Sequence, residues 1–302
     1  MNRLTSKLQN LKENNKKALV AYLVAGDPDL DTTLDLMHLF VDSGVDVIEI
    51  GVPFTDPIAE GPTIQKAHDR ALKNNISLKM ILELVDMFRE TNTETPIVLM
   101  GYLNTFISHI DLVQSIGENS ADSILVVDVP GELNLQTYGI TNPNINTISL
   151  ISPTTKEDRV ESIAKNSTGF IYYVTLRGVT GSSNLNIEEI KNNIQKIQQY
   201  SDAPTMAGFG IKSVEDASTL AACSDGIVIG SSIVEMIADE YRFLKSSLFF
   251  ISVGTAESST CIIIVDISIG LITRVRVGLI SVRGFCSCRK INEHISMLSY
   301  TQ

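Results

Sequence analysis

Cysteine is scarce in this chain, with four among 302 residues. Four thiols at this length do not form the disulfide framework that stabilises small secreted domains. Cys286 and Cys288 are separated by one residue and lack a second pair of ligands, which is not the spacing of a structural zinc site. The sequence therefore predicts neither a disulfide scaffold nor a metal site.

Basic residues are also in the minority, with 24 Lys and Arg against 35 Asp and Glu, and the formal net charge is -11. This balance argues against nucleic acid as a partner, because phosphate backbones are bound through Lys and Arg. It does not exclude a small anionic ligand, since backbone N–H groups can bind phosphate without cationic side chains.

Long apolar runs are missing as well. Ile262–Ile272 is apolar but short and contains Asp266, so no transmembrane helix is predicted there. Met1–Lys17 is polar and basic and lacks the apolar core of a signal peptide, and we predict a short amphipathic helix. Without a targeting segment we expect a cytoplasmic protein, although a protein encoded in an organelle and working in its stroma, such as that of a plastid, would show the same features.

The composition, 44% hydrophobic and 20% charged, is that of a soluble globular protein with one large domain or two small ones. From residue 18 to 246, apolar segments alternate with segments of helical periodicity, and eight such pairs predict a (β/α)8 TIM barrel of class α/β. A doubly wound open sheet is the alternative. We favour the barrel because unusual polar, aromatic and glycine residues follow many different strands, whereas an open sheet would gather them at one switch point. The predicted strands are Ala18–Ala25, Asp46–Gly51, Pro96–Tyr102, Ser123–Val129, Thr147–Ile151, Gly169–Thr175, Pro204–Ala207 and Gly226–Ile229. The predicted helices are Asp31–Asp42, Thr63–Asn75, Ser77–Glu90, Lys156–Asn166, Asn186–Gln199, Ser213–Ala222 and Ser232–Lys245.

The second predicted strand carries a carboxylate, Glu49, within an otherwise apolar run. Burying a carboxylate without a partner costs free energy, so a glutamate at this position indicates either a pairing partner or a functional role. A loop with three prolines and two glycines follows and ends near a second acid, Glu60. Two carboxyl groups facing one small ligand are the arrangement of general acid–base catalysis. The alternative is a strand-end glutamate that pairs with a nearby Lys or Arg.

Other polar and aromatic residues also stand near the C-terminal ends of predicted strands, where the active site of a barrel lies. Each aromatic residue taken alone is equally well explained as barrel core. Together they predict a pocket for a flat apolar group. These residues are Tyr22, Tyr102, Asp128 and Tyr172.

Glycines mark the ends of the last three strands. Gly178–Gly181 follows the sixth strand, Gly208–Gly210 the seventh, and Gly230 with Ser231 the eighth, where a helix begins. Loops at these positions and a helix N-terminus form the recurring phosphate site of this fold. The alternative is that these are turn glycines with no ligand.

The chain resembles the tryptophan synthase alpha subunit family over about residues 1–246, which would be the barrel domain. The motifs that carry the resemblance occur in order along the chain. They are LVAGDP at 23–28, IEIGVPFTDPIAEGP at 48–62, DVP at 128–130, GVTG at 178–181, GFG at 208–210 and IGSSIV at 229–234.

The resemblance implies a lyase of L-tryptophan biosynthesis that splits indole-3-glycerol phosphate by a retro-aldol step into indole and glyceraldehyde 3-phosphate. Glu49 matches the general acid–base of the family. Glu60 matches the acid that stabilises the indole N–H, where the family pattern has Asp, so its longer arm alters the geometry. Tyr172 matches the family tyrosine near the catalytic glutamate.

The resemblance also implies the walls of the site. The loop Arg177–Leu185 would close over the substrate and exclude water. Tyr22, Met100, Tyr102, Leu125, Val127 and Ile151 match the substrate pocket, and Thr180, Gly181, Gly210, Gly230 and Ser231 match the phosphate positions.

No cofactor or metal is implied for this subunit. Its partner would be the beta subunit, which carries pyridoxal phosphate and receives indole in an alpha2beta2 heterotetramer, and Asp56 and Asp128 would lie on the face toward it. Two other functions remain open. The chain could be a catalytically weak subunit that mainly activates a beta partner, or another phosphate-binding barrel enzyme.

The family pattern ends after about Lys245, and residues 247–302 form an atypical tail. The net charge of the tail is +2, whereas that of the preceding residues is -13. Within the tail, Ile272–Val282 alternates weakly, as a strand would. Three interpretations stay open, and we favour the second: an appended segment with its own role, an altered reading frame at the 3′ end, or a loosely packed tail.

Overall fold

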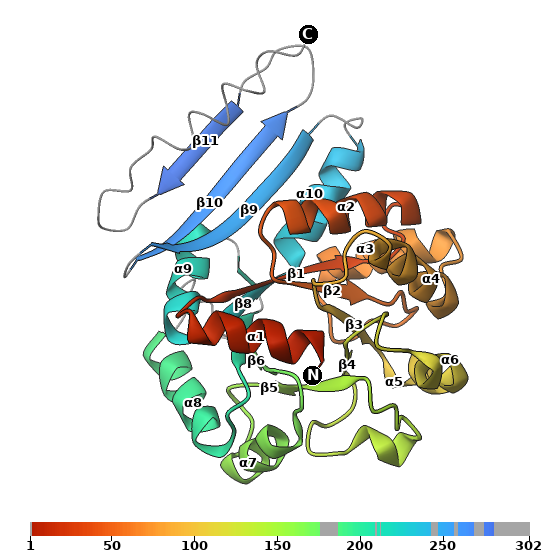
Figure 1. Cartoon of the computed structure of the whole chain (residues 1–302), viewed down its shortest axis with the longest axis vertical. Helices are drawn as coiled ribbons and strands as arrows, with labels where there is room; N and C mark the ends of the chain where they lie inside the picture. Colours follow the sequence, from red (N-terminus) through yellow and green to blue (C-terminus); the bar gives the residue numbers. More distant parts are fainter. Residues whose placement is uncertain are drawn as a thin grey trace.

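The computed structural model describes residues 2–175, 187–208, 210–211 and 213–242, together with three C-terminal strands. Eight parallel strands close into one barrel in the order β1 to β8, and β8 pairs with β1 (Figure 1). The TIM-barrel prediction is confirmed. The strands are β1 (Ala18–Val24), β2 (Val47–Gly51), β3 (Ile97–Gly101), β4 (Ser123–Val126), β5 (Asn146–Ile151), β6 (Ile171–Val174), β7 (Thr205–Gly208) and β8 (Gly226–Ile229).

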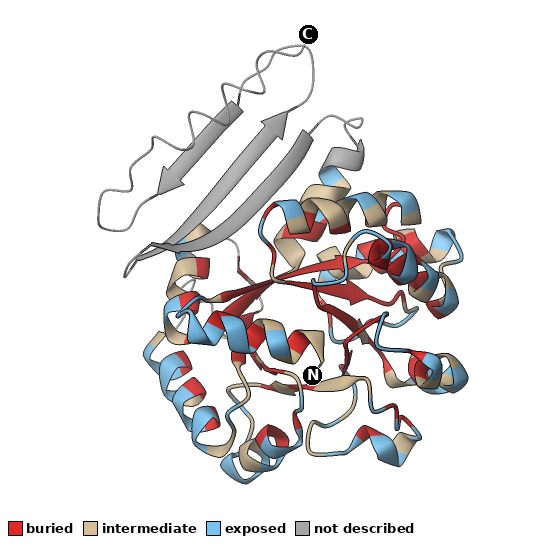
Figure 2. Cartoon of the chain, in the orientation of Figure 1, coloured by how far each residue is buried: buried red, intermediate tan, exposed pale blue. Residues whose placement is uncertain are grey.

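Helices surround the barrel and cover its outer face, so that buried residues lie on the strands and on the inner sides of the helices (Figure 2). All seven predicted crossover helices are present, with ends that differ by a few residues. They are α2 (Leu30–Asp42), α3 (Pro62–Lys73), α4 (Leu78–Arg89), α7 (Glu157–Asn166), α8 (Ile187–Tyr200), α9 (Val214–Cys223) and α10 (Ser231–Arg242). Ser213 caps α9 by accepting a hydrogen bond from the Asp216 N–H at 3.1 Å.

The crossovers after β3 and β4 contain only short helices. The first contains α5 (Leu103–Ser108) and α6 (Ile110–Ser115), and the second contains the 3-10 turn η1 (Leu135–Tyr138). Each of these has six residues or fewer, which is less than two turns of helix and leaves no 3.6-residue periodicity to detect.

The predicted N-terminal helix is α1 (Arg3–Glu13). Its apolar stripe of Leu4, Leu8 and Leu11 is buried against the inward-facing side chains at the N-terminal ends of the strands. Arg3 pairs with Asp122 at 3.0 Å, just before β4 begins. Helix α1 therefore closes the floor of the barrel, which leaves the C-terminal ends of the strands as the mouth.

The tail contains three strands in an antiparallel sheet, in the order β11-β10-β9. These are β9 (Ser247–Ala256), β10 (Ser259–Ser268) and β11 (Val275–Ile280), the last within the predicted strand segment. The division into a barrel at 1–246 and a tail at 247–302 stays a prediction. Among the described residues, no helix combines the length and the apolar character needed to span a bilayer.

Candidate active site

Side chains alternate along each barrel strand between the interior and the helical layer. On β1 and β2 the register places Tyr22 directly beside Glu49. Each follows by two residues a member of the inward-facing cluster, Val20 and Val47, so both point into the barrel. Glu49 is 1% exposed, and its Oε1 has no hydrogen-bond partner among the described residues. Burial, and then the nearby charge of Glu60, raise the pKa of Glu49 to about 8. The side chain is therefore a neutral acid at pH 7 that can still lose its proton.

Glu60 lies at the end of the loop that follows β2, and it is buried. The hydroxyl of Tyr102 donates a hydrogen bond to its Oε2. Tyr102 is itself fixed from two sides, because the Ala59 N–H donates to its oxygen at 3.0 Å and the ring of Phe54 stacks on it at a centroid distance of 4.6 Å. Burial and the hydrogen bond to Glu60 raise the pKa of Tyr102, so it stays protonated and serves as a donor. Tyr102 thus contacts the second acid directly.

His68, on α3, is a third titratable group beside this loop. The Phe54 N–H donates to its Nδ1 at 3.0 Å, and its Nε2 lies 3.6 Å from Oε1 of Glu60. No pattern in the sequence points to this residue. A single histidine on an amphipathic helix forms no motif, and its place as the seventh residue of α3 gives no signal unless the fold of the preceding loop is known.

Two tyrosines frame Glu49 inside the barrel. A Cβ atom at Gly51 would lie 2.2 Å from the Tyr22 hydroxyl, and one at Gly208 would lie 2.8 Å from the Tyr172 hydroxyl. The two glycines therefore make the space that these rings occupy. Burial, followed by nearby carboxylates, raises the pKa of both phenols well above 10, so both are neutral at physiological pH. The acid is enclosed by uncharged rings.

Apolar side chains complete the interior near Glu49. Leu125, together with Val127 and Met100 at its edge, packs in the inward-facing cluster. The structure brings these three side chains together, and their role as a substrate pocket stays a prediction.

The glycines after β7 and β8 lie beside the N-terminus of α10. Gly210 has a φ of 72°, in the region that favours glycine. The hydroxyl of Ser232 donates to the Ile211 carbonyl at 2.7 Å and ties the β7–α9 loop to the first turn of α10. Gly230 immediately precedes that turn and Ser231 begins it. Backbone N–H groups at this position lack acceptors within the helix. Thr180, Gly181 and the whole of the loop Arg177–Leu185 lie outside the described residues.

Comparison with known proteins matches this arrangement to one family. The sequence profile described as "Tryptophan synthase alpha chain" matches residues 8–252. The tryptophan synthase alpha chain of Nitrosomonas europaea is 45% identical over 240 residues, 78% of this chain and 87% of that protein. The chain belongs to the tryptophan synthase alpha chain family.

Further relatives agree with this assignment. The Neisseria meningitidis serogroup B alpha chain is 46% identical over 224 residues, 73% of this chain and 86% of the relative. The crystal structure of the alpha subunit from Legionella pneumophila superposes with a TM-score of 0.73 and 40% identity, covering 80% of this chain and 91% of that one.

Membership of the tryptophan synthase alpha chain family establishes the activity. The chain is a lyase of tryptophan biosynthesis that acts on indole-3-glycerol phosphate. The family requires no cofactor of its own, and pyridoxal phosphate belongs to the beta subunit. Among the described residues, no group of three His, Cys, Asp or Glu side chains is placed to bind a metal ion.

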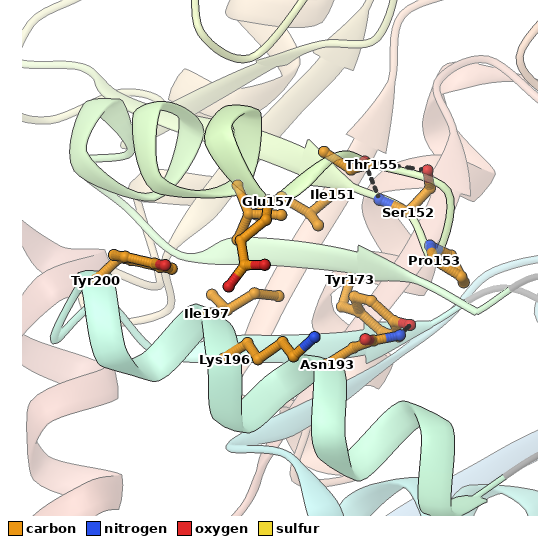
Figure 3. A pocket seen from close by; sticks show the side chains of 11 residues that line it. Ile151, Ser152, Pro153, Thr155, Glu157, Tyr173, Asn193, Lys196, Ile197 and Tyr200 are labelled. Atoms are coloured by element: carbon orange, nitrogen blue, oxygen red, sulfur yellow. Dashed lines mark hydrogen bonds between the residues drawn. The ribbon is translucent and has the colours of Figure 1, made fainter.

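One predicted pocket residue of this alpha chain is corrected by the structure. Ile151 is buried in the large cluster between the strands and the helices, which also contains Ile163 and Ile171, and not inside the barrel. It lines a polar cavity of about 250 Å³ between β5, α7 and α8, into which Glu157 and Lys196 extend (Figure 3). The inward-facing neighbour on β5 is Leu150. Strand alternation decides this difference, because a shift of one residue reverses the face.

The two aspartates predicted at the partner face are both exposed at the barrel mouth. Asp56 accepts a hydrogen bond from the Thr55 hydroxyl at 2.7 Å. Asp128 accepts one from the Leu103 N–H at 2.8 Å, and this bond joins the end of β4 to α5. Near Asp56, the side chain of Ile58 is 83% exposed.

Proposed function

We propose that Glu49 is the general acid and base of a retro-aldol cleavage of indole-3-glycerol phosphate. Its proton passes to C3 of the indole ring, which becomes a cationic indolenine. The carboxylate then takes the proton of the side-chain hydroxyl next to C3. The bond between C3 and the glycerol carbon breaks, its electron pair restores the indole, and the hydroxyl carbon becomes the aldehyde of glyceraldehyde 3-phosphate. Glu49 ends protonated, as it began.

The observation that carries this proposal is the unlike environment of the two acids. Glu49 is buried among neutral rings with a pKa of about 8, whereas the carboxylate of Glu60 accepts a hydrogen bond from the Tyr102 hydroxyl. Two carboxyl groups whose environments differ in this way can serve as acid and as anion at the same pH. Glu60 would stabilise the indole N–H as it becomes acidic in the cationic intermediate.

The remaining residues would bind the two ends of the substrate. Tyr22, Met100, Leu125, Val127 and Leu150 would contact the indole, with Tyr172 beside the reacting carbon. Gly210, Gly230 and Ser231 would bind the phosphate through backbone N–H groups and one hydroxyl, supported by the positive end of the α10 dipole. Thr180 and Gly181 are proposed for the same site on the family motif alone.

A beta subunit is the proposed partner, in an alpha2beta2 assembly that passes indole from one chain to the other. A chain in the crystal structure of tryptophan synthase from M. tuberculosis, in its aminoacrylate-bound form, is 25% identical to this chain with a TM-score of 0.70. Asp56 and Asp128 would contact the partner, and Ile58 offers apolar area on the same face. A cytoplasmic location stays a prediction.

Indole release by the isolated chain tests the assignment. We expect slow release from indole-3-glycerol phosphate, a rate increase when a beta subunit is added, and loss of about 10²–10⁴ in rate for Glu49→Gln. A chain that releases no indole alone but stimulates the beta reaction would instead be an activating subunit. Near-normal turnover by Glu49→Gln would refute the role of Glu49.

A further inference from the structure

His68 is a buried side chain that the proposed chemistry leaves without a role. It lies on α3 with an exposed fraction of 1%. Its Nδ1 accepts the Phe54 N–H at 3.0 Å. Because a backbone N–H can only donate, Nδ1 carries a lone pair, and the proton of the neutral ring is on Nε2.

The protonated side of this ring faces the second acid. Nε2 of His68 has no hydrogen-bond partner among the described residues and lies 3.6 Å from Oε1 of Glu60. That separation is longer than a hydrogen bond, but a small movement of the loop would close it. The other carboxylate oxygen, Oε2, already accepts the hydroxyl of Tyr102. The carboxylate therefore has a donor directed at each oxygen.

We propose that His68 is a positioning residue for Glu60. It completes, together with Tyr102, a clamp that holds the carboxylate as an oriented anion where the indole N–H arrives. A donor at each oxygen restricts the rotation of the carboxylate and fixes its direction. This inference rests on the proposed function, because it gives His68 a part in the same reaction.

The clamp also accounts for the length of this acid. A glutamate has one more rotatable bond than the aspartate of the family pattern, so fixing its carboxylate costs more conformational entropy. A free glutamate carboxylate also moves over a wider range than that of an aspartate. Small misplacements of a catalytic group lower the rate steeply. A second donor at His68 offsets this freedom.

The decisive variant is His68→Asn. The Asn amide oxygen can accept the Phe54 N–H in place of Nδ1, but its shorter side chain brings no donor to Glu60. We expect kcat to fall about tenfold, the size of one lost hydrogen bond to a charged group, with KM changed less than about threefold. The matched control is His109→Asn, at an exposed histidine, which should keep kcat within about twofold.

A double-mutant cycle separates positioning from general destabilisation. In a Glu60→Asp background the shorter acid is out of reach of His68, so His68→Asn should lower kcat by less than about threefold. An equal loss in both backgrounds, or an unchanged kcat in the single variant, would overturn the proposal.

The contact between Nε2–H of His68 and the Glu60 carboxylate can also be measured without turnover. Nitrogen-15 NMR should show His68, assigned by its loss in His68→Asn, with a bare Nδ1 and a protonated Nε2. The Nε2–H resonance should move in Glu60→Gln. An Nδ1–H tautomer, or a resonance indifferent to Glu60→Gln, would overturn the clamp. If the wild-type chain released no indole while these shifts were present, the proposed function would fail and the pairing would stand.

Discussion

Replacement of Glu49 by Gln should stabilise the fold at alkaline pH while removing the activity. The folded-state pKa of about 8 lies above the ordinary value of 4.5. The folded chain therefore holds this proton more tightly than the unfolded chain does. The contribution of this proton to the free energy of unfolding is fully present below pH 4.5. It is lost progressively as the pH rises from 4.5 through 8, and stability does not change further with this group above that range. At 1.36 kcal/mol per pKa unit, the loss amounts to about 3–5 kcal/mol.

Glutamine keeps the shape of the neutral acid and cannot ionise. Glu49→Gln and wild type should therefore have similar free energies of unfolding at pH 5. At pH 8.5 the variant should be more stable by about 3–5 kcal/mol. Other buried carboxyl groups with raised pKa values, among them Asp46 and Asp122, are present in both chains and cancel in the difference.

Urea unfolding followed by circular dichroism at pH 5, 7 and 8.5 measures this difference. Glu83→Gln, at an exposed glutamate on α4, is the control and should stay within about 0.5 kcal/mol of wild type throughout. The lyase rate of wild type, kcat/KM, should fall above pH 8 as the acid is lost. Stability curves for wild type and Glu49→Gln that run parallel with pH would refute the raised pKa of Glu49, and with it the assignment of the proton donor.

Three further predictions concern other parts of the molecule. Gly51→Ala should lower kcat/KM at least tenfold, because the added Cβ would lie 2.2 Å from the Tyr22 hydroxyl and displace the ring beside Glu49; an unchanged rate would contradict this packing. Gly210→Val should raise KM for the phosphorylated substrate, since φ is 72° there and a branched side chain would also intrude on the phosphate; an unchanged KM would remove this glycine from the site. Truncation after Ser246 should leave the melting temperature and activity nearly unchanged, because the eight strands close without the tail; loss of cooperative unfolding would place the tail in the core.

The barrel could be predicted because its signals are local and repeated. Most strands are apolar runs followed by a periodic helix, and the predicted strand ends lie within a few residues of those observed. The short helices after β3 span less than two turns each and were not predicted. Closure of the sheet by β8 on β1 is a long-range pairing, and it was inferred from the distribution of unusual residues and not from any contact in the sequence.

The site was predictable only as far as it lies on strands. Glu49 stood out because a charge interrupts an apolar run, and the buried environment explains the anomaly. Ile151 was placed in the pocket through the family motif, and the alternation of β5 reverses that choice in favour of Leu150. His68 could not be found, because its contact with Glu60 depends on how the loop after β2 folds back over α3. The contacts that depend on loop geometry were the ones that sequence patterns could not supply.

The helix that closes the floor of the barrel has a kinetic consequence. With Leu4, Leu8 and Leu11 filling that end, substrate entry and product departure share the opposite end. Indole would then have to leave by the route through which the next substrate arrives, so it should inhibit competitively. A chain docked over that route would accept indole directly and relieve the inhibition. Coupled turnover would in this way be faster than the lyase alone, even if docking left the chemistry at Glu49 unchanged.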